Sequence, residues 1–470
     1  MNQGKSLNLV IMVVSLLLLL ISFCYDTQNT FLIIFPSFLI LLITSVPVLM
    51  GREHNVFSPL NYLIYFIFLN LIVRNLYIIY DYPSESYVSN IFLLFKSKDT
   101  LVKPLVVMLI SFMSFTLGYL FYSRRRPVRD EKLITWNSKK LNVLSVVLLF
   151  VSFVSLVKFI ISSKVNILML TLQTFSAYRG VTKNLEDYDA HGFLRVLIQL
   201  SVIVFYINYI YYKRSVKKTF WNRLFIFLSF LISILFFFFV QSRSGVIFIF
   251  INCFVINYYL KGGRFSYKSV SLLFVSIVVL FSFMTSLRGG SGFDLKEAVE
   301  DSLFTILDPL VANNGGVDVS KTGHIMEYVN THDDFKYGWG YLWLGSSFIP
   351  RSIWSNKPVS MDTEVGMKVY NAGSYGSGAV PPGLVAESYW NFGYLGILVV
   401  PFFVGVFTRV LHNYFRIIYN DNNKILLYVI CFMGVPYSCF GSSIVSMLLG
   451  VIYLFVPLQL SLKFITKVEK

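Results

Sequence analysis

Long apolar runs fill almost the whole of this 470-residue chain and leave little room for any other kind of structure. Many of the runs approach or reach the ~20 residues with which an α-helix crosses a bilayer. Only 14% of the residues are charged, well below the share of roughly 25% found in soluble domains. The sequence therefore predicts one all-α polytopic integral membrane domain over residues 1–470.

The runs divide the chain into about twelve expected membrane-spanning helices. The first run has no A-x-A-like cleavage site before Tyr25, so we expect a retained helix and not a removed signal peptide. Only the gap between the ninth and tenth runs is large, and we expect residues 288–388 to form a loop with short helices. The expected spans are residues 7–23, 31–50, 59–80, 104–122, 141–162, 193–212, 224–240, 246–260, 269–287, 389–411, 425–439 and 444–462.

The distribution of charge orients these spans. Segments on the side of both termini hold more than half of the 40 Lys and Arg residues, and cytoplasmic segments typically carry such an excess. Both termini are therefore expected in the cytoplasm and residues 288–388 outside. The net charge of +16 follows from this orientation and from anionic lipid, and it requires no nucleic-acid partner. Of the 24 acidic residues, the cytoplasmic set holds only Glu53, Asp130, Glu131, Asp421 and Glu469.

Several cations lie near the outer ends of spans, where the orientation rule does not explain them. A charge at this depth costs a few kcal/mol, so it usually faces a cavity or a partner, unless the side chain snorkels to the headgroups. The short turn of residues 241–245 gives Arg243 little freedom and suits a diphosphate, which guanidinium groups can bind bidentately. These cations are Arg74, Lys158, Arg195, Arg243 and Arg288.

The expected outer loop is rich in aromatic residues interleaved with Gly, Pro and cations. Tryptophans at an outer interface often form an aromatic belt. A belt does not explain their place inside a loop, however, and flat aromatic faces beside polar donors suit sugar rings. The candidate sugar-binding residues are Trp339, Tyr341, Trp343, Trp354 and Trp390.

Three residues of the loop are candidate general bases. Glu387 lies on the first turn of an apolar helix, where the helix dipole alone could account for it, or where it could accept a proton. His324 and Glu327 are three residues apart in a short helical candidate and share a face. Asp187 and Asp189 have the spacing of some divalent-cation sites, but such acids are usually solvated, so we expect neither a metal site nor a cofactor.

Three segments of the chain resemble the Wzy-type O-antigen and capsule repeat-unit polymerases, which are related to the O-antigen ligases. The resemblance implies a membrane glycosyltransferase of the lipid-linked-sugar type with a GT-C-like architecture, in the bacterial inner membrane with its active site facing the periplasm. The matching segments are Ile349-Pro350-Arg351…Trp354…Lys357-Pro358, Pro382-Gly383-Leu384…Glu387…Asn391-Phe392-Gly393-Tyr394-Leu395-Gly396, and Ser242-Arg243-Ser244-Gly245.

The resemblance implies polymerisation of oligosaccharide repeats carried on undecaprenyl diphosphate, with a lipid-linked donor, a lipid-linked acceptor and a chain-length regulator protein as partners. The leaving diphosphate needs cationic stabilisation, and the acceptor hydroxyl needs a base. An O-antigen ligase remains an alternative, whereas a flippase would usually show two similar halves, which we do not see. The candidate diphosphate-binding residues are Arg179, Arg243, Arg288, Arg351 and Lys357.

The orientation can be tested by cysteine labelling. In a variant without the native cysteines, a single cysteine placed within residues 288–387 should react with a membrane-impermeant maleimide added to the outer face. A cysteine placed within residues 213–223 should react only after the membrane is opened. The reverse pattern would refute the expected orientation.

Overall fold

The structure is a computed structural model that describes most of the expected spans and about half of the large loop. Its described residues are 3–25, 28, 30–53, 55–76, 101–122, 134–162, 193–216, 218–240, 242–264, 268, 270–273, 275–276, 317–349, 353–354, 356–370, 379–415 and 421–468. Ten of the described helices are long and apolar enough to cross a membrane, which confirms the prediction of an all-α polytopic membrane protein. Of the other expected spans, residues 246–260 form a shorter apolar helix, and residues 269–287 lie largely outside the described part.

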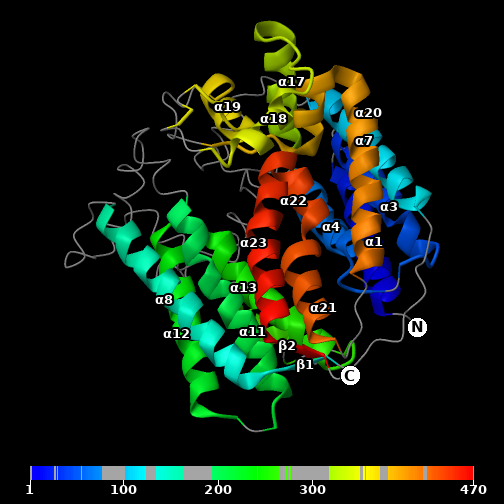
Figure 1. Cartoon of the computed structure of the whole chain (residues 1–470). Coiled ribbons are helices and arrows are strands. Elements are labelled where there is room, and N and C mark those ends of the chain that lie inside the picture. Colours follow the sequence, from blue (N-terminus) through cyan, green and yellow to red (C-terminus); the bar gives the residue numbers. More distant parts are fainter. Residues whose placement is uncertain are drawn as a thin grey trace, which may run out of the picture.

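The helices form two bundles on either side of a central segment (Figure 1). The first bundle consists of α1 (Gln3–Tyr25), η1 (Thr30–Ile34), α3 (Phe35–Leu49), α4 (Pro59–Ile67), η2 (Phe68–Val73), α7 (Val102–Phe121) and α20 (Gly383–Tyr414). The second bundle consists of α8 (Ser138–Ser162), α11 (Leu200–Arg214), α12 (Phe220–Phe239) and α13 (Arg243–Leu260). The central segment consists of α21 (Asn422–Leu427), η5 (Tyr428–Phe432), α22 (Val435–Gly441) and α23 (Ile444–Ile465).

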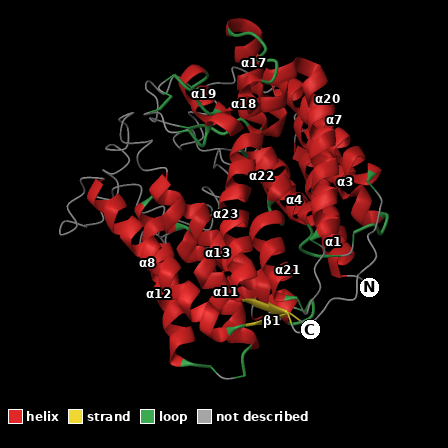
Figure 2. Ribbon diagram, viewed as in Figure 1, coloured by secondary structure: helices red, strands yellow, loops and turns green. Residues whose placement is uncertain are grey.

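Three short helices cover one end of the molecule and form what we call the cap. They are α17 (Val319–His332), α18 (Trp339–Ser346) and α19 (Met361–Lys368). Both chain termini lie at the opposite end, which we call the base, where a two-stranded sheet also lies (Figures 1 and 2). In this sheet β1 (Ile134–Trp136) pairs antiparallel with β2 (Thr466–Val468).

Helices α7 and α20 pack closely because small residues let their backbones approach. A Cβ atom on Gly118 would lie 2.0 Å from the Phe402 carbonyl oxygen, and one on Gly405 would lie 2.1 Å from the Phe115 carbonyl oxygen. The Ser111 hydroxyl also donates across the interface to a carbonyl of α20. Such close packing and interhelical hydrogen bonding drive helix association in lipid, where the hydrophobic effect does not.

Helix α20 is broken at Phe392 and Gly393, where Gly393 adopts φ 60°. A break in a helix at membrane depth frees carbonyl groups that need partners. The cap supplies them, since the Lys336 amide donates to the Trp390 carbonyl (2.9 Å) and the Tyr337 amide to the Asn391 carbonyl (2.8 Å). The expected span over residues 389–411 is therefore a helix that begins at Gly383 and changes direction within its sequence.

A buried ionic cluster ties the helices together near the base. The Glu53 carboxylate lies 3.2 Å from the Arg409 guanidinium and 3.1 Å from the His412 imidazole, and it accepts a hydrogen bond from the Tyr119 hydroxyl. Burial alone would raise the pKa of Glu53, but His412 and Arg409 lower it to about 2. Glu53 is therefore ionised at neutral pH and fixes the connection that follows α3.

The close approach of α7 and α20 leads to a stability prediction. Gly118→Ala and Gly405→Ala should each destabilise the protein by ~1–3 kcal/mol, because the added methyl group meets a backbone carbonyl that cannot move aside freely. Gly450→Ala is the matched control, since no atom lies within 4 Å of a Cβ there. Thermal unfolding in detergent measures the difference, and equal melting temperatures for all three variants would contradict the packing described.

Candidate functional site

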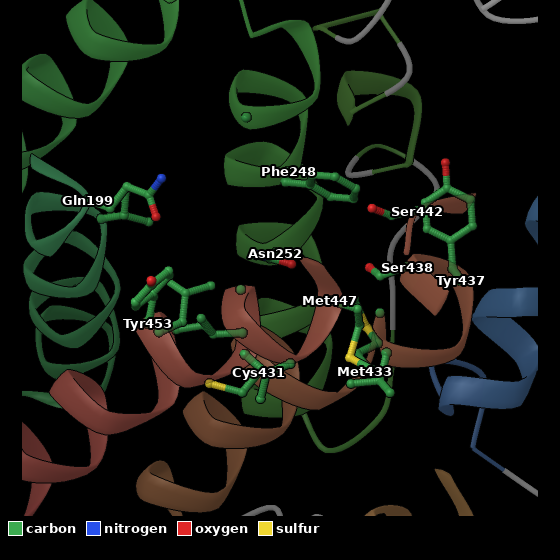
Figure 3. A pocket seen from close by; sticks show the side chains of 18 of the residues that line it. Gln199, Phe248, Asn252, Cys431, Met433, Tyr437, Ser438, Ser442, Met447 and Tyr453 are labelled. Atoms are coloured by element: carbon green, nitrogen blue, oxygen red, sulfur yellow. The ribbon is translucent and has the colours of Figure 1, made fainter. Parts of the chain in front are cut away.

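A cavity of about 690 Å³ lies between the second bundle and the central segment. Its volume is typical of sites that bind organic molecules. Apolar side chains form most of its wall, and hydroxyl and amide groups are scattered among them (Figure 3). The labelled lining residues are Gln199, Phe248, Asn252, Cys431, Met433, Tyr437, Ser438, Ser442, Met447 and Tyr453.

Residues from two helix N-termini line this cavity. Gly245 belongs to the first turn of α13, whose N-cap Ser242 accepts from the Gly245 amide (3.2 Å). Ser446 belongs to the first turn of α23, whose N-cap Ser443 accepts from the Ser446 amide (3.1 Å). Helix N-termini attract anions because their amides and dipoles point outward. The cap reaches the same cavity through Trp343 of α18.

Two carboxylates meet the N-terminus of α23. Glu387 Oε2 accepts from the Ile444 amide (2.7 Å), and Asp362 Oδ2 accepts from the Ser446 hydroxyl (2.9 Å). Glu387 is 0% exposed. Among the described residues, Glu387 Oε1 and Asp362 Oδ1 are buried without a hydrogen-bond partner. Burial raises the pKa of Asp362, although Ser446, Ser443 and Lys321 act in the opposite direction.

The position of Glu387 differs from a simple helix-dipole effect on its own helix. Glu387 belongs to α20, yet its carboxylate bonds to the first amide of α23. No local pattern marks Asp362 in the sequence, because its partner Ser446 lies 84 residues away. Reasoning from sequence therefore identified one carboxylate of this pair and missed the other.

A second group of buried charges lies under the cap. Arg74 lies 3.1 Å from Asp318, and both side chains are almost fully buried. Asp318 is also the N-cap of α17, since it accepts from the Ser320 amide at 2.9 Å. Lys321 follows on the same helix, and burial lowers its pKa to about 8 even though Asp318 and Asp362 raise it. Arg74 thus has the partner that its depth in the membrane requires.

The other outer-end cations have different surroundings. Lys158 is exposed, as expected for a snorkelling side chain. The Arg195 guanidinium lies over the Phe159 ring, 5.6 Å from its centroid. Lys158 and Arg195 therefore do not belong to the group of buried charges formed by Arg74, Asp318 and Lys321.

The structure describes only part of the expected diphosphate-binding set. Arg179, Arg288 and Arg351 lie outside the described residues. Arg243 is the first residue of α13, so its backbone lies at one of the two helix N-termini described above. Lys357 is buried and donates to the Ile349 carbonyl (2.9 Å).

The two base candidates of α17 lie in different environments. The predicted short helix is present as Val319–His332. Glu327 is exposed, whereas the half-buried His324 ring stacks on the Tyr370 ring at a centroid distance of 5.7 Å. Among the described residues, no three His, Cys, Asp or Glu side chains are arranged to hold a metal ion. Asp187 and Asp189 lie outside that part of the chain.

The candidate sugar-binding aromatics also differ in position. Trp343 lines the cavity, whereas Trp339 and Trp354 are 65% and 43% exposed. Tyr341 lies near Glu387, and burial together with that carboxylate raises the pKa of Tyr341. Trp390 is 0% exposed, with the Lys336 ammonium 4.9 Å from its ring centroid, so its ring takes part in packing.

Comparison with known proteins identifies no relative. No protein-family model, no curated protein and no solved structure matches this chain.

The Arg74–Asp318 pair leads to a prediction about the cap. Arg74→Ala should destabilise the protein by ~3–5 kcal/mol, because it leaves the Asp318 charge buried and uncompensated. The double variant Arg74→Met with Asp318→Asn should recover part of this loss, since it removes both charges. Lys158→Ala serves as the control at an exposed cation. Thermal unfolding measures the loss of stability, and limited proteolysis measures how readily the chain is cleaved in the cap. Equal stability of Arg74→Ala and Lys158→Ala would refute the prediction.

Proposed function

We propose that this protein is a membrane glycosyltransferase that polymerises oligosaccharide repeat units carried on undecaprenyl diphosphate. The single observation that carries the proposal is the arrangement of the cavity. A mostly apolar space between membrane helices is lined at two helix N-termini, one of which holds two carboxylates. Such a space suits a ligand with an apolar chain and an anionic head.

The polar parts of the cavity suit the head of this ligand. The N-terminus of α13 favours a diphosphate, and Arg243 is its first residue, whereas the N-terminus of α23 already meets Glu387 and Asp362. We propose that Arg243, Arg288 and Arg351, with Lys357 and Arg179, stabilise the charge that develops on the leaving diphosphate. Trp343 supplies a flat face where the first sugar would follow the diphosphate.

In the proposed reaction, a hydroxyl of the acceptor glycan attacks the anomeric carbon of the donor glycan. The bond between that carbon and the diphosphate oxygen breaks, and undecaprenyl diphosphate leaves with the electron pair. The hydroxyl proton needs an acceptor near the cavity. Of the three base candidates, Glu387 bonds to the first turn of α23, which lines the cavity, whereas Glu327 and His324 belong to α17.

The proposed setting is the bacterial inner membrane, with the cap facing the periplasm and the base facing the cytoplasm. The base carries the cations that cytoplasmic segments typically hold. Polymer length would be set by a separate regulator protein in the same membrane. The overall plan would then belong with the GT-C-like glycosyltransferases, which act on lipid-linked sugars.

A reconstituted reaction tests the proposal directly. The purified protein in liposomes, given one undecaprenyl-diphosphate-linked repeat unit, should form a ladder of polymers and release one carrier diphosphate per bond. A deletion strain separates the alternatives, because loss of a polymerase leaves lipid A core bearing one repeat unit. Bare core in that strain, with no ladder in the liposomes, would favour an O-antigen ligase or a flippase.

The same assay tests the role of Trp343. Trp343→Ala should raise KM for the lipid-linked donor by up to ~10-fold, the equivalent of one lost aromatic contact. Trp221→Ala is the control, because Trp221 is an exposed tryptophan at the start of α12, near the base and away from the cavity. An unchanged KM in Trp343→Ala would remove this residue from the donor site.

A further inference from the structure

Ser446 connects the cavity to a carboxylate. Its side chain lines the cavity, and its hydroxyl donates to Asp362 Oδ2 at 2.9 Å. The position of Ser446 is fixed because its amide bonds to the Ser443 side chain in the first turn of α23. A hydroxyl that donates one hydrogen bond can still accept another from a ligand. A proton could therefore pass from the cavity to Asp362 through a single side chain.

Asp362 is held in place by groups that do not use its second carboxylate oxygen. Its backbone carbonyl accepts from the Val380 amide (2.8 Å), and Ser360 caps the helix on which it lies. Asp362 Oδ1 is buried and has no hydrogen-bond partner among the described residues. The carboxylate is thus anchored through one oxygen only, and it retains capacity to take up a proton.

The charged groups around Asp362 come from several elements. Glu387 of α20 lies on the same helix N-terminus, and its carboxyl group is close enough to Asp362 to interact with it electrostatically. Lys321 of α17 adds positive charge, and behind it Arg74 and Asp318 form a pair that is neutral overall. Tyr341 of α18 lies next to Glu387. Asp362 therefore lies near one cation, Lys321, and one other carboxyl group, Glu387.

We propose that Asp362 is the proton acceptor of the glycosyl transfer and that Ser446 relays the proton to it. This inference rests on the proposed function. As the acceptor oxygen bonds to the anomeric carbon, its proton passes to Ser446 Oγ while the Ser446 proton passes to Asp362 Oδ2. The bond between the anomeric carbon and the diphosphate breaks in the same step. Asp362 later returns the proton to water.

Glu387 has a different part in this arrangement. It does not line the cavity, it is 0% exposed, and one of its oxygens already accepts from the Ile444 amide. Its hydrogen bond to Ile444 holds the first turn of α23, which also carries Ser446. Glu387 is therefore a positioning residue, and Asp362 is the group that exchanges the proton.

A purely structural role for the Asp362–Ser446 contact is the competing explanation, because the bond also joins α19 to α23. The test therefore measures kcat, its pH dependence and the melting temperature for each variant in liposomes with the lipid-linked repeat unit. The variants are Asp362→Asn, Asp362→Glu, Ser446→Ala and Ser446→Thr. The control is Asp421→Asn, which removes a carboxylate that caps α21 near the base.

Asp362→Asn should lower kcat by ~100-fold or more, the usual effect of losing a general base. Asp362→Glu and Ser446→Thr keep the reacting groups and should retain much of the activity, whereas Ser446→Ala should not. A base must be ionised to act, and burial raises the pKa of Asp362 above its ordinary 3.8. Wild-type activity should therefore fall as the pH drops through this raised pKa, and the residual activity of Asp362→Asn should lack that fall.

The possible outcomes separate the two proposals. If the wild type forms no polymer, the proposed function fails, and the relay fails with it. Suppose instead that the wild type is active, and that Asp362→Asn has the same kcat and the same loss of activity at low pH. The relay alone is then overturned. The relay is also overturned if Asp362→Asn loses activity only in proportion to a lowered melting temperature, as Asp421→Asn would.

Discussion

The bilayer requires every backbone polar group at membrane depth to have a partner, and the cap end of this protein is organised around that requirement. Helix α20 breaks at Gly393, and amides of the cap satisfy the carbonyls that the break leaves free. The first amide of α23 donates a hydrogen bond to Glu387, which lies in the part of α20 before the break.

Buried charges near the cavity are arranged so that each lies close to a neutralising group. Arg74 faces Asp318, and Lys321 lies near Asp318 and Asp362. Single oxygens of Asp362 and Glu387 are among the buried polar atoms of the described residues that have no hydrogen-bond partner. Unsatisfied polar atoms are costly in a folded protein, so positions where they persist are candidates for function. At the base, by contrast, the buried Glu53 carboxylate has several partners.

Much of this architecture could be predicted from the sequence, because hydrophobic runs report membrane spans directly. The helix of α17 and the position of Glu387 at the start of an apolar helix were also predictable, since both depend on local spacing. The contact between Asp362 and Ser446 was not, because it joins residues far apart in the chain. The burial of Trp390 could not be read from its neighbours either, since a tryptophan in a polar loop can face solvent or a core.

The small sheet at the base restricts how the second bundle and the central segment can move apart. Strand β1 is followed directly by α8 of the second bundle, and strand β2 directly follows α23 of the central segment. Three residue pairs of this sheet connect α8 to α23 at the base. Among the described residues, no sheet joins the two helices at the cap end. Any separation of α8 from α23 is therefore restrained most strongly at the base, where the paired strands hold the two helices together.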